Sequence, residues 1–326
     1  MKALVYRKYG SPDVLKFEDL EKPVPRDHEV LVKIEAASVN AADWHLLTAD
    51  IFLVRLMAGL FRPRLPILGA DLAGTVEAVG RSVRRFQPGD EVFGNAFGSG
   101  SGSFAEYTCV DEGALAPKPR NLSCEEAAAV PLAAVTALQG LRDRGGLKPG
   151  QSVVIQGSAG GVGTFAVQLA RHFGAEVTAV CGPGNLAAAK ALGADHVVDY
   201  TREDFTRNGK KYDLILGVNG FHSLGDYRRA LAPRGVYVMA GGSQAQMFQS
   251  LLLGPWMSRK TGKKLLTLSA KPNLEDLLLL RDLAEAGKIV PVIDRVFPLA
   301  ETAEALRYLG TGHARGKVVI SVGREG

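Results

Sequence analysis

The sequence predicts an α/β protein with a mostly β first domain and a second domain built on a doubly wound parallel sheet. Residues 1 to about 120 carry short β-like runs separated by turns that contain Pro, Gly and Asp. From about Ser123 onward, helical and strand-like segments alternate, which indicates a parallel sheet because parallel neighbours need a long return connection. The composition, with 46% hydrophobic and 22% charged residues in a chain of 326, agrees with about two globular domains.

The elements of the first half are expected to be short strands with apolar and β-branched residues. They are expected at 3–7, 29–39, 73–80, 90–94 and 104–110. A helix is expected over 124–143, where alanines and leucines replace the turn residues.

The second half is expected to alternate strands and crossover helices. The strands are expected at 152–157, 176–182, 196–200, 212–219, 236–242 and 264–270. The helices are expected at 165–174, 186–193, 226–232 and about 273–286.

The last β-like pieces, at 294–299 and 316–322 around a helix near 301–309, do not continue this alternation. We therefore expect them to return to the first domain. The expected domains are 1–121, completed by 272–326, and 122–271. Two such crossings would allow the domains to hinge around a cleft.

The stretch VVIQGSAGGVGTFAVQLA, residues 153–170, joins an expected buried strand to an expected helix through a turn with four glycines. A turn of this kind places backbone N–H groups at the start of a helix, where the helix dipole favours an anion such as a pyrophosphate. The spacing is GxGxxG with Ser158, Gly160 and Gly163 at the three glycine positions. A packing turn without a ligand remains the alternative.

Charge, cysteines and the amino-terminal residues narrow the class of protein. The net charge of +5 suits anionic small molecules at least as well as nucleic acid, and no recognised nucleic-acid motif accompanies it. The three cysteines form no CxxC pair, which argues against a structural zinc site. The start MKALVYRKYG is charged where a signal peptide is apolar, and no uncharged run is long enough to span a membrane. A cytoplasmic protein that is not an integral membrane protein is therefore expected.

Several motifs together resemble the medium-chain dehydrogenase/reductase superfamily, and within it the zinc-independent quinone oxidoreductase and alcohol dehydrogenase-like branch. The motifs are ASVNAADWHL, LPILGADLAGTVEAVG, GDEVFG, LAAVTALQGL, GSAGGVGTFAVQLA, LGADHVVDY and ARGKVVI, in this order along nearly the whole chain. The resemblance implies a GroES-like mostly β domain, a Rossmann domain, a cleft between them, NADP(H) chemistry and commonly a homodimer.

The residues argue against catalytic zinc. Zinc-dependent relatives place a Cys three residues before an Asp, and a His-Glu pair after the glycine of a later loop. Here those places hold Asn40 before Asp43, and Ala70-Asp71 after Gly69. Because Asn and Ala cannot serve as zinc ligands, no metal is expected.

Without a metal, the easiest hydride acceptor is one that already spreads its negative charge, such as a quinone or an α,β-unsaturated carbonyl. The family pattern puts Asn40 near the nicotinamide, so Asn40 is the candidate catalytic residue. Asp43, Trp44 and His45 are candidate substrate-binding residues. Turn capping by Asn40 and Asp43, and packing by Trp44, remain equally open.

The cofactor is expected to be NADPH, with NADH less favoured. No Asp or Glu occurs from Val177 through Lys190, where NAD-binding sites usually keep an acid for the ribose hydroxyls. The family's Lys or Arg is also missing from this loop, which has Gly184-Asn185 instead. The resemblance and the expected strand ends together give the following candidate cofactor-binding residues: Thr136, Ser158, Gly160, Gly161, Val162, Asn185, Tyr200, Val218, Asn219, Gly241, Gly242 and Lys317. For Lys317, a solvated surface lysine is the alternative.

Two apolar stretches also carry basic residues, at 51–66 and 247–264. They could form a mouth for lipophilic substrates or sit against a membrane surface. Core packing and a dimer contact explain them more simply.

The favoured function is NADPH-dependent reduction of a quinone, or of an α,β-unsaturated ketone or aldehyde, with a small and lipophilic substrate. Reduction of an enoyl thioester is the alternative within the enzymes. A non-catalytic nucleotide-binding scaffold is the alternative outside them.

Overall fold

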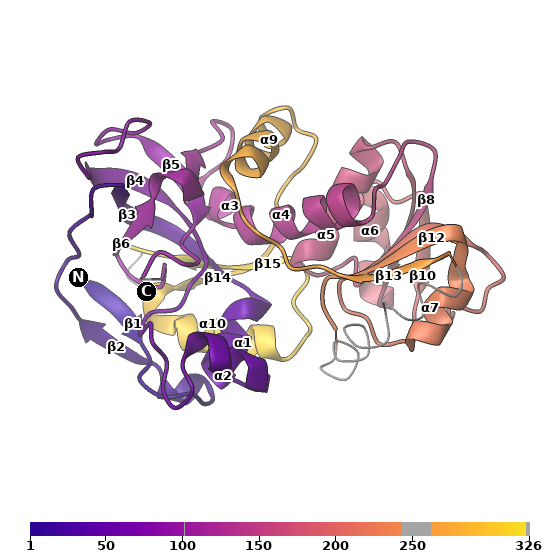
Figure 1. Cartoon of the computed structure of the whole chain (residues 1–326), viewed down its shortest axis with the longest axis horizontal. Helices are drawn as coiled ribbons and strands as arrows, with labels where there is room; N and C mark the ends of the chain where they lie inside the picture. The colour runs from indigo at the N-terminus through magenta and orange to yellow at the C-terminus, as the bar shows by residue number, and fades with distance from the viewer. Residues whose placement is uncertain (101, 243–261, 324–326) are drawn as a thin grey trace. The chain divides into compact units, whose positions relative to one another are not determined.

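The computed structural model describes residues 1–100, 102–242 and 262–323. Contacts divide the chain into two compact units (Figure 1). Unit 1 comprises Met1–Ala133, Pro272–Gly287 and Pro291–Gly326, and unit 2 comprises Ala134–Lys271 and Lys288–Val290. The second apolar stretch, at 247–264, lies outside the described residues except for its last three positions.

Unit 1 is built on a seven-stranded sheet in the order β14-β15-β3-β4-β5-β7, with β6 paired to β3. Its strands are β3 (Glu29–Val39), β4 (Asp71–Val79), β5 (Glu91–Asn95), β6 (Tyr107–Asp111), β7 (Leu115–Pro117), β14 (Ile293–Pro298) and β15 (Lys317–Ser321). A two-stranded sheet pairs β1 (Lys2–Val5) with β2 (Lys16–Asp19). The carboxyl-terminal β15 pairs antiparallel with β3, with Val318 opposite Val39.

The helices of unit 1 are short apart from α9. They are α1 (Ala41–Thr48), α2 (Phe52–Ala58), α3 (Cys124–Ala128), α9 (Leu274–Glu285) and α10 (Thr302–Gly310), and α4 (Pro131–Gln139) begins in this unit. Short 3-10 turns lie at Pro12–Val14, Glu112–Ala114 and Leu299–Glu301. The expected single helix over 124–143 is wrong. The helix is interrupted between Ala128 and Pro131, and α4 is followed by a π-helical turn at Gly140–Arg144.

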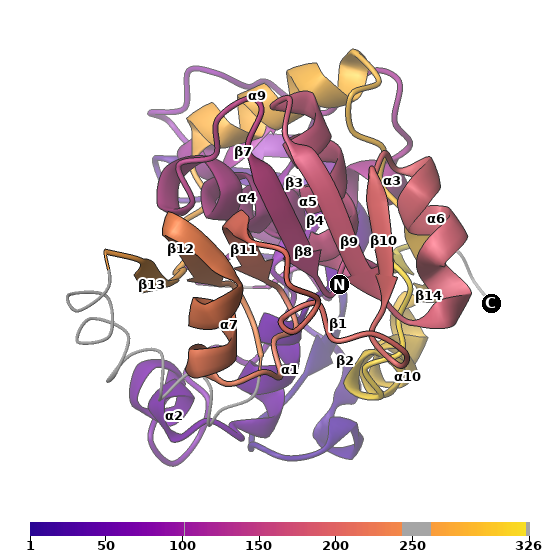
Figure 2. The same cartoon turned by 90° about the vertical axis from the view of Figure 1, so that its right-hand side faces the viewer.

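Unit 2 holds a six-stranded parallel sheet in the order β10-β9-β8-β11-β12-β13 (Figure 2). Its strands are β8 (Ser152–Gln156), β9 (Glu176–Cys181), β10 (His196–Asp199), β11 (Tyr212–Gly217), β12 (Leu231–Met239) and β13 (Lys264–Thr267). Its helices are α5 (Gly161–His172), α6 (Leu186–Ala191) and α7 (Leu224–Ala230), with a 3-10 turn at Pro183–Asn185. This strand order is that of a Rossmann sheet, so the expected fold class is confirmed.

The order also locates where a ligand would be held. Strand order reverses between β8 and β11, which are neighbours in the sheet although two other strands separate them in sequence. In open parallel sheets, ligands bind outside the carboxyl ends of the strands at such a switch point. Buried side chains that include Val154, Ile215, Tyr227 and Tyr237 form a hydrophobic core cluster of this unit.

Candidate functional site

Most of the expected cofactor-binding residues follow the carboxyl ends of the parallel strands of unit 2. Because the strands are parallel, these ends share one edge of the sheet. After β8 come Ser158, Gly160, Gly161 and Val162, after β9 Asn185, after β10 Tyr200, after β11 Val218 and Asn219, and after β12 Gly241 and Gly242. Thr136 lies apart from them in sequence, partly exposed on α4.

The glycine turn between β8 and α5 has two different kinds of glycine. A Cβ on Gly163 would lie 2.1 Å from the Gly157 carbonyl oxygen and 2.6 Å from Ser158 Cα, so only glycine lets α5 pack on the turn. A Cβ on Gly160 would meet nothing closer than 3.8 Å, so the backbone there faces open space. Gly157 has a φ of +83°, which glycine adopts without strain.

The start of α5 presents backbone donors. The first intrahelical bond, from Thr164 N to Gly160 O, is 3.0 Å long. Gly161 and Val162 are partly exposed, and within the described part of the chain their N–H groups have no acceptor. This arrangement, with open backbone above Gly160, fits a diphosphate group.

Ser158 is the exception among the turn residues. It is fully buried, and both its N–H and its hydroxyl donate to the carbonyl of Val180 in β9, each at 3.2 Å. Its polar atoms therefore join the turn to the neighbouring strand.

Two exposed aromatic side chains stand beyond the ends of β10 and β11. Tyr200 is 52% exposed and Phe221 is 60% exposed, with ring centroids 6.0 Å apart. Tyr200 also lies beside the backbone of Gly182, and a Cβ there would sit 3.6 Å from its ring. Phe221 was not among the candidates, although its position two residues after Asn219 at a strand end was a usable signal.

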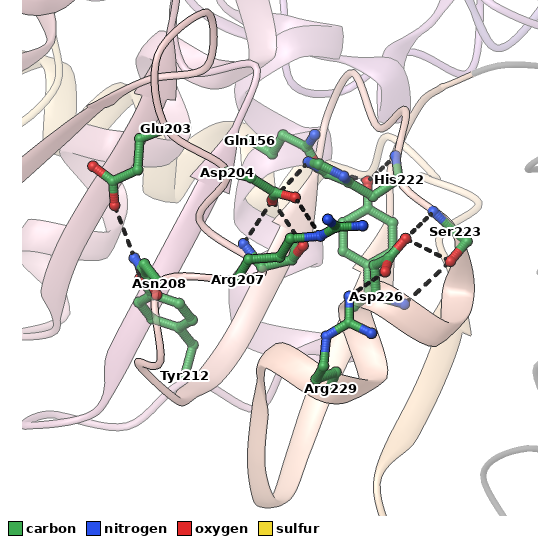
Figure 3. Close-up of polar contacts among 12 residues, drawn as sticks. Gln156, Glu203, Asp204, Arg207, Asn208, Tyr212, His222, Ser223, Asp226 and Arg229 are labelled. Carbon is green, nitrogen blue, oxygen red and sulfur yellow. Dashed lines mark hydrogen bonds and ion pairs between the residues drawn. The ribbon is translucent and has the colours of Figure 1, made fainter.

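A polar cluster joins the loops that follow β10 and β11 (Figure 3). His222 Nε2 lies 3.7 Å from Asp204 Oδ1, and the imidazole packs between Phe221 and Phe205. Burial lowers the pKa of His222, and Asp204 opposes that shift. The hydroxyl of Tyr227 donates to Gln156 Oε1 at 2.6 Å, which joins α7 to the end of β8. These contacts fix the position of the segment that carries Phe221 and His222.

In unit 1, Asn40, Asp71 and Lys317 form a buried polar network. The ammonium of Lys317 donates to Asn40 Oδ1 at 2.5 Å and lies 3.5 Å from Asp71 Oδ2. Asn40 Nδ2 donates to Asp71 Oδ2 at 3.0 Å and to the carbonyl of Ser38 at 3.2 Å. Both amide hydrogens of Asn40 therefore have acceptors already.

The Asp71 carboxylate is completely buried and is surrounded by donors. Besides Asn40, it accepts hydrogen bonds from Ser38 Oγ, Asn95 Nδ2 and the N–H of Leu132, at 2.9 to 3.0 Å. Burial lowers the pKa of Lys317, while the carboxylate of Asp71 counteracts this. The sequence predicted neither this role for Asp71 nor the closure of the network by Lys317.

Asp43 caps α1. Its carboxylate accepts from the N–H of Asn40 at 2.8 Å and from the N–H of Gly69 at 3.1 Å. Burial, and to a smaller extent Asp71, raise the pKa of Asp43 to about 7. Of the two interpretations left open by the sequence, this geometry supports capping.

Trp44 and His45 point to other neighbours. The Trp44 ring packs against Gly310 of α10, where a Cβ would come within 2.5 Å of it. His45 Nδ1 lies 2.9 Å from Asp50 Oδ1, and its side chain is 37% exposed. Neither side chain contacts the Lys317 network through a hydrogen bond within the described residues.

Comparisons with known proteins cover both halves of the chain. Residues 26–120 match the family model described as alcohol dehydrogenase GroES-like domain, and residues 192–320 match the one described as zinc-binding dehydrogenase. A 2-methylene-furan-3-one reductase of Solanum lycopersicum is 38% identical over 98% of this chain and 79% of its own length. An NADPH-dependent alkenal/one oxidoreductase, chloroplastic, of Arabidopsis thaliana is 35% identical over the same shares.

A solved structure extends this similarity to the three-dimensional fold. The quinone oxidoreductase from Coxiella burnetii superposes with a TM-score of 0.86 at 32% identity, over 99% of each chain. The chain is a medium-chain dehydrogenase/reductase. Within that superfamily it belongs to the quinone oxidoreductase branch, as its motifs indicated.

In this medium-chain dehydrogenase/reductase, the residues at the family's zinc position do not form a zinc donor set. Asn40 and Ala70 offer neither thiolate nor imidazole, and the Lys317 ammonium lies against Asn40 and Asp71, where it would repel a cation. Among the described residues, no three His, Cys, Asp or Glu side chains group as metal ligands.

The expected cytoplasmic location of this medium-chain dehydrogenase/reductase is contradicted by its relatives. Besides the chloroplastic alkenal/one oxidoreductase, a chloroplast envelope quinone oxidoreductase homolog of Arabidopsis thaliana is 32% identical over 98% of both chains. Within the described residues, no helix combines the length and the apolar character that a bilayer crossing requires.

Proposed function

We propose that this protein is a zinc-independent, NADPH-dependent oxidoreductase that transfers a hydride to a conjugated carbonyl acceptor, either a quinone or an α,β-unsaturated ketone or aldehyde. The glycine turn that opens onto α5 carries this proposal, because its free N–H groups and its glycine-only packing suit a dinucleotide diphosphate. The names of similar proteins, quinone oxidoreductase and alkenal/one oxidoreductase, support the acceptor class.

The proposed binding mode assigns a separate task to each group of residues in unit 2. Gly161 and Val162 would donate N–H groups to the diphosphate. Gly241 packs against the Val218 carbonyl, where a Cβ would come within 2.3 Å, and so would hold the ends of β11 and β12 together beside the cofactor. The reduced nicotinamide supplies the hydride when it is bound. Tyr200 and Phe221 offer two exposed ring faces on which a planar base can stack.

The preference for NADPH over NADH is proposed from the loop after β9. No carboxylate stands there to bind ribose hydroxyls or to repel a 2′-phosphate. Asn185 is partly exposed and Tyr200 is exposed, so both are available as donors. Arg202 is exposed as well, and its Nε lies 3.7 Å from Asp199 Oδ2. The relative named as NADPH-dependent agrees with this choice.

The proposed chemistry of unit 1 depends on a fixed ammonium instead of a metal. Lys317 places a buried positive charge beside Asn40, which would favour negative charge that develops on an acceptor oxygen nearby. Asn40 would contact the acceptor only by exchanging one of its present hydrogen bonds. Trp44 and His45 are proposed to contact the acceptor, while Asp43 would act through the position of α1.

Following NADPH absorbance with a simple quinone, an enone and an enoyl-CoA tests the proposal. We expect turnover with the quinone or the enone, at a lower KM for NADPH than for NADH, and no loss of activity after treatment with a chelator. Faster turnover of enoyl-CoA would favour the thioester reductase. Tight NADPH binding without turnover of any acceptor would favour a nucleotide-binding scaffold.

Assembly and domain limits belong to the same proposal. A homodimer is proposed, as is common in the family, and sedimentation velocity tests it directly.

The proposed functional domains are a GroES-like domain at 1–121 completed by 272–326, and a Rossmann domain at 122–271. Limited proteolysis followed by mass spectrometry of the fragments would locate their boundaries.

A further inference from the structure

The segment 51–70, which includes α2 and the loop that follows it, exposes apolar side chains on unit 1. Leu56 is 53% exposed, Leu60 44%, Phe61 89% and Leu65 42%. These four are among only thirteen large hydrophobic residues exposed in the described part of the chain, yet they lie within ten consecutive positions. Of the two simpler explanations that the sequence left open, core packing does not account for these exposed side chains, and a dimer contact is the other.

The only charged or hydrogen-bonding side chains in this segment are arginines. Between Asp50 and Asp71 the sequence contains no Asp, Glu, Ser, Thr, Asn, Gln, His or Lys. Arg62 and Arg64 are exposed and have no ion-pair partner within the described residues. With Arg7, Tyr6 and two prolines they line a cavity of about 460 Å³. Arg7 is paired with Glu18, so the positive charge without an ion-pair partner in the described residues is that of Arg62 and Arg64, beside exposed apolar side chains.

The backbone holds these side chains outward. Gly59 has a φ of +128°, and a Cβ there would lie 2.1 Å from the carbonyl oxygen of Arg62. The N–H of Arg64 donates to the Ala58 carbonyl at 2.8 Å, and the hydroxyl of Tyr9 donates to the Gly59 carbonyl at 2.6 Å. The loop is thus folded back on α2 by hydrogen bonds, without burial of Phe61.

We propose that Leu56, Leu60, Phe61, Arg62, Arg64 and Leu65 form a membrane-docking surface for anionic lipid bilayers. Exposed leucines and a phenylalanine partition into the boundary between headgroups and acyl chains, and guanidinium groups bind lipid phosphates. A protein partner would be met by a rim of neutral polar groups as well, and this segment has none. The proposal stands independently of the hydride-transfer function.

The test is sedimentation of the full chain with vesicles of phosphatidylcholine alone, or of phosphatidylcholine mixed with phosphatidylglycerol. We expect binding only to the anionic vesicles, with release by high salt. The variant R62Q/R64Q should weaken binding about 30-fold, because each basic residue near an anionic surface contributes roughly a factor of five. The variant F61S should weaken it about tenfold through lost apolar burial.

Matched controls use exposed residues elsewhere. Phe17 is 46% exposed, and Arg81 and Arg144 are exposed, so F17S and R81Q/R144Q should bind as the parent does. In a further variant, Phe61→Trp, the tryptophan emission should shift to shorter wavelength on binding.

Several results would overturn the proposal. They are absence of binding to both vesicle types, equal losses in the control variants, and unchanged emission from Phe61→Trp while the protein sediments. Binding to polyglutamate that depends on Arg62 and Arg64 but not on Phe61, without vesicle binding, would indicate an acidic protein partner instead. Activity of each variant with NADPH and a quinone reports separately on the proposed function.

Discussion

In the glycine turn of unit 2, Gly163 is needed for packing and Gly160 faces open space, and single substitutions can separate these two roles. In Gly163→Ala, the new Cβ would meet the Gly157 carbonyl at 2.1 Å, so the turn or α5 must move. We expect a loss of about 1–3 kcal/mol in the free energy of unfolding, together with much weaker NADPH binding. Urea unfolding and isothermal titration calorimetry measure the two effects.

Gly160→Ala is the matched control for this substitution. Its Cβ has open space in the free protein and Gly160 has a φ of −82°, so stability should change little. Its methyl group would nevertheless occupy the side of the turn proposed for the diphosphate, so NADPH affinity should fall. If Gly160→Ala left NADPH affinity unchanged, the diphosphate would not lie where we propose.

Lys317 allows a test of the buried network in unit 1. Lys317→Met removes the ammonium and leaves the completely buried Asp71 carboxylate without its cationic partner. We expect a loss of about 3–5 kcal/mol in the free energy of unfolding, as for other broken buried pairs. The double variant K317M/D71N should recover part of it, as measured by urea unfolding.

Lys2→Met is the control for Lys317→Met, since the Lys2–Asp19 pair is exposed on both sides. It should leave stability unchanged. A loss in Lys317→Met no larger than in this control would mean that the ammonium is not held as the contacts indicate.

At the scale of single elements, helix α1 links stability to pH through its cap. Asp43 has a pKa raised to about 7, whereas an unfolded aspartate titrates near 3.8. The folded state therefore binds the extra proton, and between these values the free energy of unfolding should fall as the pH rises. Above about pH 7 this residue adds no further slope, because it is ionised in both states.

Urea unfolding between about pH 4 and 7 measures this slope, which should be smaller in Asp43→Asn. The carboxyl carbon resonance of Asp43 should titrate near its raised pKa, and that resonance should be absent from Asp43→Asn. An Asp43 resonance that titrates near the ordinary value would contradict the burial that α1 imposes on its cap.

Elements with strong local signals could be predicted from the sequence. The strand expected at 29–39 is β3, and the helix expected at 273–286 is α9 to within a residue at each end. α9 has both an Asn273 cap, which accepts from Asp276 N at 2.9 Å, and regular apolar spacing. Such signals need no knowledge of the rest of the fold.

Elements decided by their neighbours could not be predicted. The helix expected at 226–232 lies at Leu224–Ala230, because Leu231 already pairs with Tyr212 of β11. Helices α1 and α2 are too short for an apolar period and were not expected.

The candidate site divides in the same way. The glycine turn is local, so its residues could be named from the sequence. The bond from Lys317 to Asn40 spans 277 positions and depends on the register of β15 against β3. The roles of Asn40, Lys317 and the other site residues toward a cofactor or acceptor stay predictions.

At the scale of the whole chain, the proposed cofactor binding should raise the thermal stability of the protein. A ligand that binds only the folded protein stabilises it by about 2.7 kcal/mol at a free concentration 100-fold above its Kd. For a folding unit of the size of unit 2, this corresponds to a rise of roughly 5–10 °C in the temperature of its transition. Differential scanning calorimetry with NADPH should show this rise.

NADH at equal concentration should give a smaller rise, because no acid after β9 binds its ribose hydroxyls. A chelator should leave both the free and the NADPH-bound transitions unchanged, since the Lys317 ammonium lies beside Asn40 and Asp71, where it would repel a cation. Equal shifts with NADH and NADPH would remove the argument for a 2′-phosphate site around Asn185 and Tyr200. A transition lowered by the chelator would show that a metal contributes to the fold, and the role proposed for the Lys317 ammonium would fail with it.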